Sequence, residues 1–208
     1  MTLIKICGIT NIEDAIECVK LGANMLGFVL ADSPRRADVD TVKHIGRIIG
    51  GDARTVGVFT QESEYVISAF HECNLNYVQL HGNQSEEFAQ KIGADSVIRV
   101  ARVQNQETID ALAIHQAAAF YLLDTYKKGV AGGTGEVFDW DIAIRAKSLG
   151  KPLILSGGLN PDNVAEAIRV VRPYAVDVSS EVEKSPGKKD FAKVKEFIDN
   201  VRKADNRT

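Results

Sequence analysis

Short apolar stretches recur along the chain and alternate with segments whose apolar residues fall at helical spacing. Each stretch has the length of a β-strand, and several are apolar at successive positions, which is typical of strands covered on both faces. Their starts lie roughly 20 to 30 residues apart, enough for a strand, a helix and two loops. We expect strands at LIKIC (3–7), MLGFVL (25–30), RTVGVF (54–59), LNYVQL (75–80), SVIRVA (96–101), AFYLLD (119–124), PLILS (152–156) and YAVDVS (174–179).

The segments between these strands carry helix start and stop signals. Asn11 is placed to cap a helix that Gly22 ends, and the apolar residues between them share one face. Asn160 followed by Pro161 predicts another helix start, with the proline at the first helical position. The last helix is predicted over DFAKVKEFIDNV, with a buried face made of Phe191, Val194, Phe197, Ile198 and Val201.

Eight strand–helix units predict the α/β class and a single (β/α)8 barrel, the TIM barrel, with parallel strands over residues 1–208. The alternative is an open, doubly wound sheet. The first strand–helix turn lacks the G-x-G-x-x-G pattern that such sheets use for dinucleotides, which speaks against it. In a barrel the chemistry lies at the carboxyl ends of the strands, so the residues that end each strand are the candidates for function.

Composition and charge narrow the class of protein. A chain of 208 residues with 45% hydrophobic and 25% charged residues fits one soluble globular domain. The net charge of −3 does not favour nucleic-acid or membrane partners, and no apolar run is long enough to span a membrane. The three cysteines, Cys7, Cys18 and Cys73, form no C-x-x-C pair. They predict a reducing, cytoplasmic setting without disulfides or zinc.

Three strand ends carry side chains that can do chemistry. Cys7 ends the first strand, where a thiol is either a small buried hydrophobe or a nucleophile or base. Arg35 and Arg36 follow the second strand, and one of them can bind a carboxylate or phosphate, although paired loop arginines are more often solvated. His81 ends the fourth strand, where we favour a hydrogen bond to a neighbouring strand over a role in proton transfer.

Asp124 ends the apolar sixth strand, where a carboxylate needs a partner or a function. If it is desolvated, it can hold a proton for donation. Glycines at positions 129, 132, 133 and 135 follow it. They are consistent with a lid that closes over the site, or with an ordinary long loop.

The stretch SGGLNPDN (156–163) follows the seventh strand. In barrels of this class the loops after strands 7 and 8 often hold a phosphate group. Gly157 and Gly158 let backbone N–H groups approach such a group, and Ser179 and Ser180 after the eighth strand add further donors. We also expect a short helix near Glu181 that directs its positive end at the anion. One such turn would also fit a tight connection, but two on these strands favour phosphate.

Ten motifs along the chain together resemble phosphoribosylanthranilate isomerase of tryptophan biosynthesis. They are KICGIT (5–10), GFV (27–29), SPR (33–35), VGVF (56–59), VQLHG (78–82), LLDT (122–125), GGTG (132–135), FDW (138–140), LSGGLNPDNV (155–164) and VDVSSEVE (176–183). The resemblance extends from residue 3 to about residue 200, in order and at the expected spacing. It implies a TIM barrel and an Amadori rearrangement of N-(5'-phosphoribosyl)anthranilate.

The resemblance implies roles for individual residues. Asp124 looks like the general acid that opens the ribose ring, and Cys7 like the general base that removes the C2' proton. Arg35 is expected at the anthranilate carboxylate. Gly157, Gly158, Ser179 and Ser180 are expected at the phosphate. No metal or organic cofactor is implied, and the partner is a small phosphoribosyl substrate bound by a monomer or a homodimer.

One position departs from the family pattern, and another offers a second arginine beside the expected one. Glu181 stands where the family usually has glycine, and we expect its carboxylate to weaken phosphate binding. Arg36 can take the place of Arg35.

Two rival functions are weighed against the isomerase. One is another phosphosugar isomerase, such as the aminoimidazole-carboxamide ribotide isomerase of histidine synthesis, which uses aspartate on strand 1 where this chain has Cys7. The other is a weakly active phosphate-ligand binding protein, which would need neither Cys7 nor Asp124.

Overall fold

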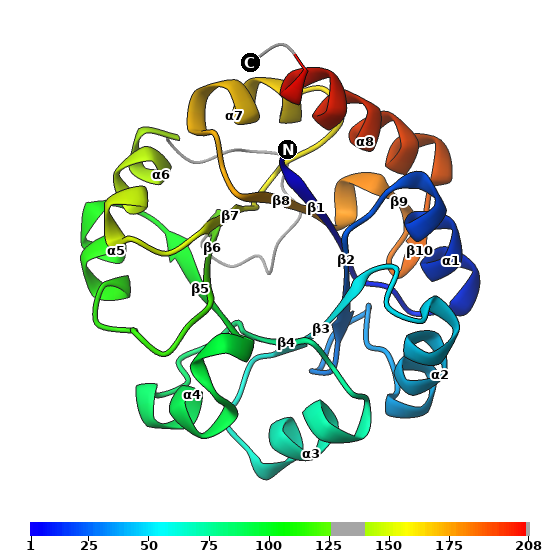
Figure 1. The fold of residues 1–208 in the computed structure, drawn as a ribbon, viewed down its shortest axis with the longest axis horizontal. Coiled ribbons are helices and arrows are strands. Elements are labelled where there is room, and N and C mark those ends of the chain that lie inside the picture. Colours follow the sequence, from blue (N-terminus) through cyan, green and yellow to red (C-terminus); the bar gives the residue numbers. More distant parts are fainter. Residues whose placement is uncertain (126–139, 207–208) are drawn as a thin grey trace.

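The computed structural model describes residues 1–125 and 140–206. In this part of the chain, parallel strands close into a barrel in the order β1-β2-β3-β4-β5-β6-β7-β8. Figure 1 shows the barrel ringed by helices. The predicted fold class is therefore confirmed, and the open sheet is excluded. The barrel strands are β1 (Leu3–Cys7), β2 (Met25–Val29), β3 (Arg54–Phe59), β4 (Tyr77–Leu80), β5 (Val97–Val103), β6 (Phe120–Thr125), β7 (Leu153–Leu155) and β8 (Ala175–Val178).

The helices follow the strands in turn around the outside. They are α1 (Ile12–Leu21), α2 (Val39–Ile49), α3 (Glu64–Glu72), α4 (Glu86–Ile92), α5 (Gln106–Leu112), α6 (Trp140–Ala146), α7 (Val164–Val171) and α8 (Phe191–Asp205). Within the described residues there are also 3-10 turns at η1 (Ala94–Ser96), η2 (Lys147–Leu149) and η3 (Ser180–Val182). No helix of the described residues is long and apolar enough to cross a membrane.

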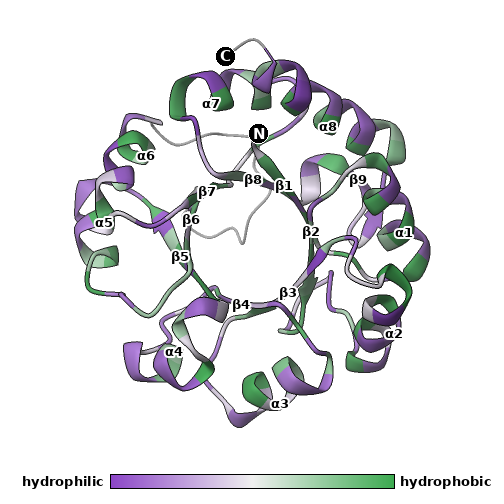
Figure 2. Ribbon diagram, in the orientation of Figure 1, coloured by the Kyte–Doolittle hydropathy of each residue, from purple (hydrophilic) through white to green (hydrophobic). Residues whose placement is uncertain are grey.

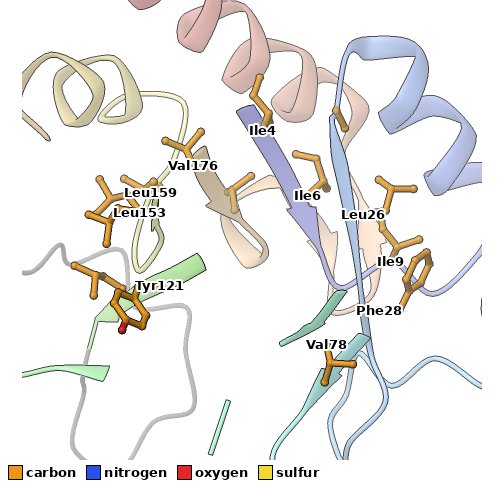
Figure 3. Close-up of a cluster of buried hydrophobic side chains, with 14 of the residues drawn as sticks. Ile4, Ile6, Ile9, Leu26, Phe28, Val78, Tyr121, Leu153, Leu159 and Val176 are labelled. Carbon is orange, nitrogen blue, oxygen red and sulfur yellow. The ribbon is translucent and has the colours of Figure 1, made fainter. Parts of the chain in front are cut away.

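The main core lies between the barrel wall and the helices. Figure 3 shows part of it, with Ile4 and Ile6 of β1 and Leu26 and Phe28 of β2 among the buried side chains. Along each helix hydrophobic and hydrophilic residues alternate, as Figure 2 shows, because one face covers the barrel and the other meets water. Burial of this apolar surface is the main favourable contribution to folding.

A second, smaller cluster fills the inside of the barrel. It consists of strand residues that alternate with those of the outer core: Met25, Val56, Ile98, Phe120, Leu122, Ile154 and Ala175. Side chains two positions further along the same strands point inward as well, since strand side chains alternate between faces. On β6, on β8 and just after β7 these positions are polar, at Asp124, Asp177 and Ser156, whereas Val58 and Val100 on β3 and β5 stay apolar.

Two details of the helix predictions need revision. Asn11 caps α1 and Gly22 ends it, as predicted. By contrast, α7 begins at Val164 rather than at Pro161. The side chain of Asn160 accepts hydrogen bonds from the backbone N–H groups of Asp162 and Asn163, at 2.9 and 3.0 Å, and so closes a separate turn before the helix.

Phe191, predicted to lie on the buried face of α8, is only half-buried. It is the first residue of the helix, and its ring lies under the Lys184 ammonium group at 5.8 Å from the ring centroid. The other predicted core positions of α8 are buried.

A short antiparallel hairpin between β8 and α8 was not predicted. It consists of β9 (Glu183–Ser185) and β10 (Lys188–Lys189) and lies beside α1 in Figure 1. With two or three residues to a strand and four charged side chains, it shows no apolar alternation that would signal it in the sequence.

Candidate active site at the carboxyl ends of the strands

Cys7 ends β1 and lies two residues after Lys5, so both side chains point into the barrel. The neighbouring strand presents Gly27 opposite Cys7. A methyl group on Gly27 would lie 2.7 Å from the Cys7 sulfur and 3.1 Å from the Lys5 nitrogen. The absent side chain at position 27 therefore makes the space in which the thiol and the ammonium group meet.

Lys5 is a buried cation beside this thiol. Its nitrogen lies 2.8 Å from the carboxylate of Asp177 on β8, and its side chain is fully buried. Burial alone lowers the pKa of Lys5, but Asp177 and Cys7 together raise it to about 12. Burial raises the pKa of the Cys7 thiol, and Lys5 opposes that rise. The resting site thus holds a neutral thiol next to a cation that can stabilise its thiolate.

Asp124 lies on β6, with its carboxylate 3.4 Å from Nε2 of His81. The amide nitrogen of Gln79 lies 3.2 Å from the other ring nitrogen, Nδ1. An amide N–H donates, so the tautomer that fits this contact accepts at Nδ1 and carries its proton on Nε2, the nitrogen nearer to Asp124. The Asp124 side chain is 17% exposed, so it is not fully desolvated, and it lies within ion-pairing distance of the His81 ring.

The preferred interpretation of His81, a hydrogen bond to a neighbouring strand, is confirmed for its backbone but does not describe its ring. Its backbone N–H does bond to the Phe59 carbonyl on β3, at 2.8 Å, as expected for a residue at a strand end. Its ring, however, contacts Asp124, which belongs to a strand two positions away in the barrel. The closure of the barrel brings these side chains together, and sequence order gives no sign of it.

Arg35, rather than Arg36, lies over the end of β1. A methyl group on Gly8 would be 2.9 Å from Cδ of Arg35, so the arginine stem runs directly above that glycine. The guanidinium group makes a two-pronged ion pair with Glu183, through Nε at 3.0 Å and Nη2 at 2.8 Å. The Arg36 side chain is exposed.

The loops after β7 and β8 lie side by side, because these two strands pair in parallel. Gly157 and Gly158 have φ angles of 78° and 71°, a left-handed conformation that favours glycine. Their backbone N–H groups donate to no other residue in the described part of the chain. Ser179 and Ser180 follow on β8, and the Ser179 hydroxyl donates to the Cys7 carbonyl at 3.1 Å.

The short helix expected near Glu181 is only the single 3-10 turn η3, and the chain then enters β9. The turn ends there because Glu183 pairs across the hairpin with Lys189 at 2.9 Å. The Glu181 side chain is half-buried and accepts a hydrogen bond from the Ser180 hydroxyl at 3.4 Å. Its expected weakening of phosphate binding stays a prediction.

The closed barrel gathers most of the predicted site residues. Cys7, Arg35 and the serines come from neighbouring strands β1, β2 and β8, and the glycine loop after β7 separates them from Asp124 on β6. Among residues 1–125 and 140–206, no three His, Cys, Asp or Glu side chains gather as a metal site requires. The proposed lid and the motifs GGTG and most of FDW lie outside the described residues.

Sequence reasoning missed four charged residues that surround the site: Lys5, Asp177, Glu183 and Lys189. All four are buried, which is rare for charged side chains unless they are paired. A signal for two of them was present. Lys5 and Asp177 interrupt apolar strands two positions before Cys7 and Ser179, on the same inward face.

We predict that Gly8→Ala weakens substrate binding in addition to lowering stability through backbone strain. Gly8 has a φ of 82°, so alanine is strained there, by about 1 kcal/mol or more. The new methyl group also collides with Arg35. Gly50→Ala is the matched control, because Gly50 has a φ of 55° with no atom near its missing side chain.

Both alanine variants should lower the free energy of unfolding in urea, but only Gly8→Ala should raise KM for substrate. An unchanged KM in Gly8→Ala would contradict the proposed place of Arg35.

The geometry above can be set beside known proteins. The model of the family described as N-(5'phosphoribosyl)anthranilate (PRA) isomerase matches residues 4–200. A curated relative from Trichlorobacter lovleyi, named N-(5'-phosphoribosyl)anthranilate isomerase, is 44% identical over 98% of this chain and 100% of its own length.

Solved structures agree. The phosphoribosyl anthranilate isomerase from Thermotoga maritima superposes with a TM-score of 0.91 at 40% identity, covering 98% of this chain and 100% of the other. A phosphoribosyl anthranilate isomerase in complex with reduced 1-(o-carboxyphenylamino)-1-deoxyribulose 5-phosphate matches with a TM-score of 0.87 at 39% identity, over 98% of this chain and 100% of the other. With both the family model and near-complete relatives in agreement, this chain belongs to the N-(5'-phosphoribosyl)anthranilate isomerase family.

Proposed function

We propose that this chain converts N-(5'-phosphoribosyl)anthranilate to 1-(2-carboxyphenylamino)-1-deoxyribulose 5-phosphate, a step in tryptophan synthesis. The observation that carries the proposal is the match to the isomerase family over nearly the whole chain, from residue 4 to residue 200. The reaction is an internal oxidation and reduction, in which C1' of the sugar is reduced and C2' is oxidised. It needs proton transfers and no external electron donor.

Asp124 is proposed as the general acid. It donates a proton to the ring oxygen while the bond from C1' to that oxygen breaks, and the anthranilate nitrogen supplies the electron pair that forms a protonated Schiff base. The contact with His81 supports this role, because the imidazole beside the carboxyl group helps to fix its position while the carboxyl group itself carries the proton to be donated. The partial exposure of the pair leaves the carboxyl group within reach of the barrel mouth.

Cys7 is proposed as the general base. Its thiolate takes the proton from C2', and the electrons of that C–H bond move to form a C1'–C2' double bond, which neutralises the Schiff base. In the enol that results, C1' takes up a proton while the C2' hydroxyl loses one, and the product is the ketone. The neighbouring ammonium group of Lys5 supports this role, since it offsets part of the cost of forming a thiolate in a buried site.

Arg35, Gly157, Gly158, Ser179 and Ser180 are proposed as the binding groups. The guanidinium of Arg35 is suited to the substrate carboxylate. The two glycines and two serines offer backbone N–H groups and hydroxyls to the phosphate. A single domain, the absence of a cofactor, a monomer or homodimer, and a cytoplasmic location stay predictions.

Of the two rival functions, one is disfavoured by the comparisons and the other needs an experiment. The family match and Cys7 disfavour an isomerase of histidine synthesis. Binding without turnover is decided by the first experiment below.

We predict that wild type consumes phosphoribosylanthranilate, generated in place, with rapid loss of anthranilate fluorescence. Cys7→Ser and Asp124→Asn should each lower kcat by about 100-fold or more, because each removes one proton-transfer group but keeps its size. Retained binding of a phosphate ligand would show that the variants are folded. Wild type that binds phosphate ligands without turnover would favour the rival binding function.

The dependence on pH tests the role of Lys5. A thiolate base becomes available as pH rises through the pKa of Cys7, which burial raises and Lys5 lowers. Lys5 lowers the pKa of Cys7 by more than Asp177 raises it, so removing both should still move the rising limb of kcat/KM to higher pH, by less than the loss of Lys5 alone would. The variant to use is Lys5→Met with Asp177→Asn, because removing both partners leaves no unpaired buried charge.

The control for this pH experiment is Lys20→Met, which removes an exposed lysine. A rising limb at the same pH in the double variant and in wild type would show that Lys5 does not act on the base.

We predict that His81→Asn lowers kcat by about 10- to 100-fold while KM changes less, because the imidazole contacts the acid and not the binding groups. His44→Asn on α2 is the control, since His44 is exposed in the middle of an outer helix. The measurement is steady-state kinetics at one pH, which gives kcat and KM for both variants and for wild type. A wild-type kcat in His81→Asn would exclude a part for His81 in proton transfer.

A further inference from the structure

The hairpin formed by β9 and β10 is attached to the ends of β1 and α1. The Thr10 hydroxyl donates to the Gly187 carbonyl at 2.6 Å, in the turn of the hairpin. The backbone N–H of Lys189 donates to the carboxylate of Asp14 on α1 at 2.9 Å. Asp14 is itself buried and held by Asn11, the cap of the helix. The hairpin therefore has a defined position against the loop that follows Cys7.

Lys189 directs its charge inward from this hairpin. Its side chain is fully buried, and its nitrogen lies 2.6 Å from the Cys7 carbonyl and 3.2 Å from the Ser179 carbonyl. It therefore joins the end of β1 to the loop proposed to bind phosphate. Its third partner is the carboxylate of Glu183, at 2.9 Å.

Glu183 joins this lysine to Arg35. Its side chain is only 3% exposed, and both of its oxygens accept from Nε of Arg35 at 3.0 Å. Its Oε2 atom also lies 2.8 Å from Nη2 of the same arginine. The edge of the guanidinium made by Nε and Nη2 is thus occupied, and Nη1 lies on the opposite side of the planar group.

The balance of charge leaves a place for one anion. Arg35 and Lys189 share one carboxylate, that of Glu183, whereas the Asp14 carboxylate accepts from the backbone of Lys189 and not from its ammonium group. Within this ion-paired trio one positive charge is therefore left over. The Arg35 side chain is 23% exposed, whereas the side chains of Glu183 and Lys189 are buried. A carboxylate that approached Nη1 from the barrel mouth would meet this remaining charge in a fixed orientation.

We infer that Glu183 and Lys189 are positioning residues, which hold the guanidinium of Arg35 and the backbone of Cys7 in one rigid frame so that the substrate carboxylate is recognised next to the base. The inference rests on the proposed function. It differs from a merely structural role in one respect. A structural residue affects all ligands alike, whereas Glu183 should matter only for ligands with a carboxylate.

The test uses two unreactive ligands, so that binding is measured without turnover. One is the reduced product analogue 1-(2-carboxyphenylamino)-1-deoxyribitol 5-phosphate, and the other is its counterpart without the carboxyl group. In Glu183→Gln the side chain keeps its size and loses its charge. We expect the Kd of the carboxylate ligand from calorimetry to rise about 10-fold and that of its counterpart less than twofold.

The background of Arg35→Lys shows whether Glu183 acts through the arginine. There, Glu183→Gln should cause little further loss for the carboxylate ligand, because the fork that Glu183 orients is absent. Glu166→Gln is the matched control, since it breaks an exposed ion pair with Arg169 of 2.7 Å and should change neither Kd. Thermal unfolding of each variant verifies that it is folded.

Lys189→Met is the second variant, and Lys188→Met, on the exposed neighbour, is its control. If Lys189→Met is folded, KM should rise and kcat should fall together, because Lys189 contacts the Cys7 carbonyl as well as Glu183. If Lys189→Met does not fold, the ligand-binding measurements on Glu183→Gln alone test the positioning role.

Equal losses for both ligands in Glu183→Gln, no loss for either, or an additive loss in the Arg35→Lys background would overturn the inference. A wild type that turns over substrate yet shows no preference for the carboxylate ligand would overturn it together with the role of Arg35. A wild type without turnover that still prefers the carboxylate ligand would refute the proposed reaction and leave the positioning role supported.

Discussion

The buried charges around the end of β1 constrain the active end of this barrel more than any other interaction. Lys5 pairs with Asp177 inside the barrel, and Lys189 pairs with Glu183 just outside the β1 terminus. Removing one partner of such a pair typically costs about 3–5 kcal/mol, because the other charge is left buried and uncompensated. The backbone between these two pairs has little freedom to move, and Cys7 lies on it.

The two pairs act on Cys7 in different ways. The inner pair places a cation against the sulfur, in the space left by Gly27, and so changes the energy of the thiolate. The outer pair contacts the carbonyl of the same residue and extends through Glu183 to Arg35. The inner pair therefore acts on the charge state of the Cys7 side chain, and the outer pair holds the Cys7 backbone in place by a hydrogen bond.

Barrel closure is what makes these contacts available. β1 lies between β8 and β2, so residues from the end of the chain reach the beginning of it. The same closure places His81 of the β4 terminus against Asp124 of β6, across the inward face of β5. The apolar cluster inside the barrel provides the firm base below this polar layer. The side chains proposed to carry the chemistry thereby lie together at the carboxyl ends of the strands.

The sequence by itself determined the strands and helices, the barrel, and the candidates at its strand ends. Apolar periodicity and caps such as Asn11 are local properties, and they identify elements without knowledge of their neighbours. The motifs also determined the family, which the match over residues 4–200 shows.

Only the tertiary structure decided which partner each charged residue has. The choice of Arg35 over Arg36, the contact of His81 with Asp124, and the network of Glu183 and Lys189 join residues that are far apart in the chain. The energy of such a pair depends on distance and burial in space, and neither is encoded in the local pattern of the chain.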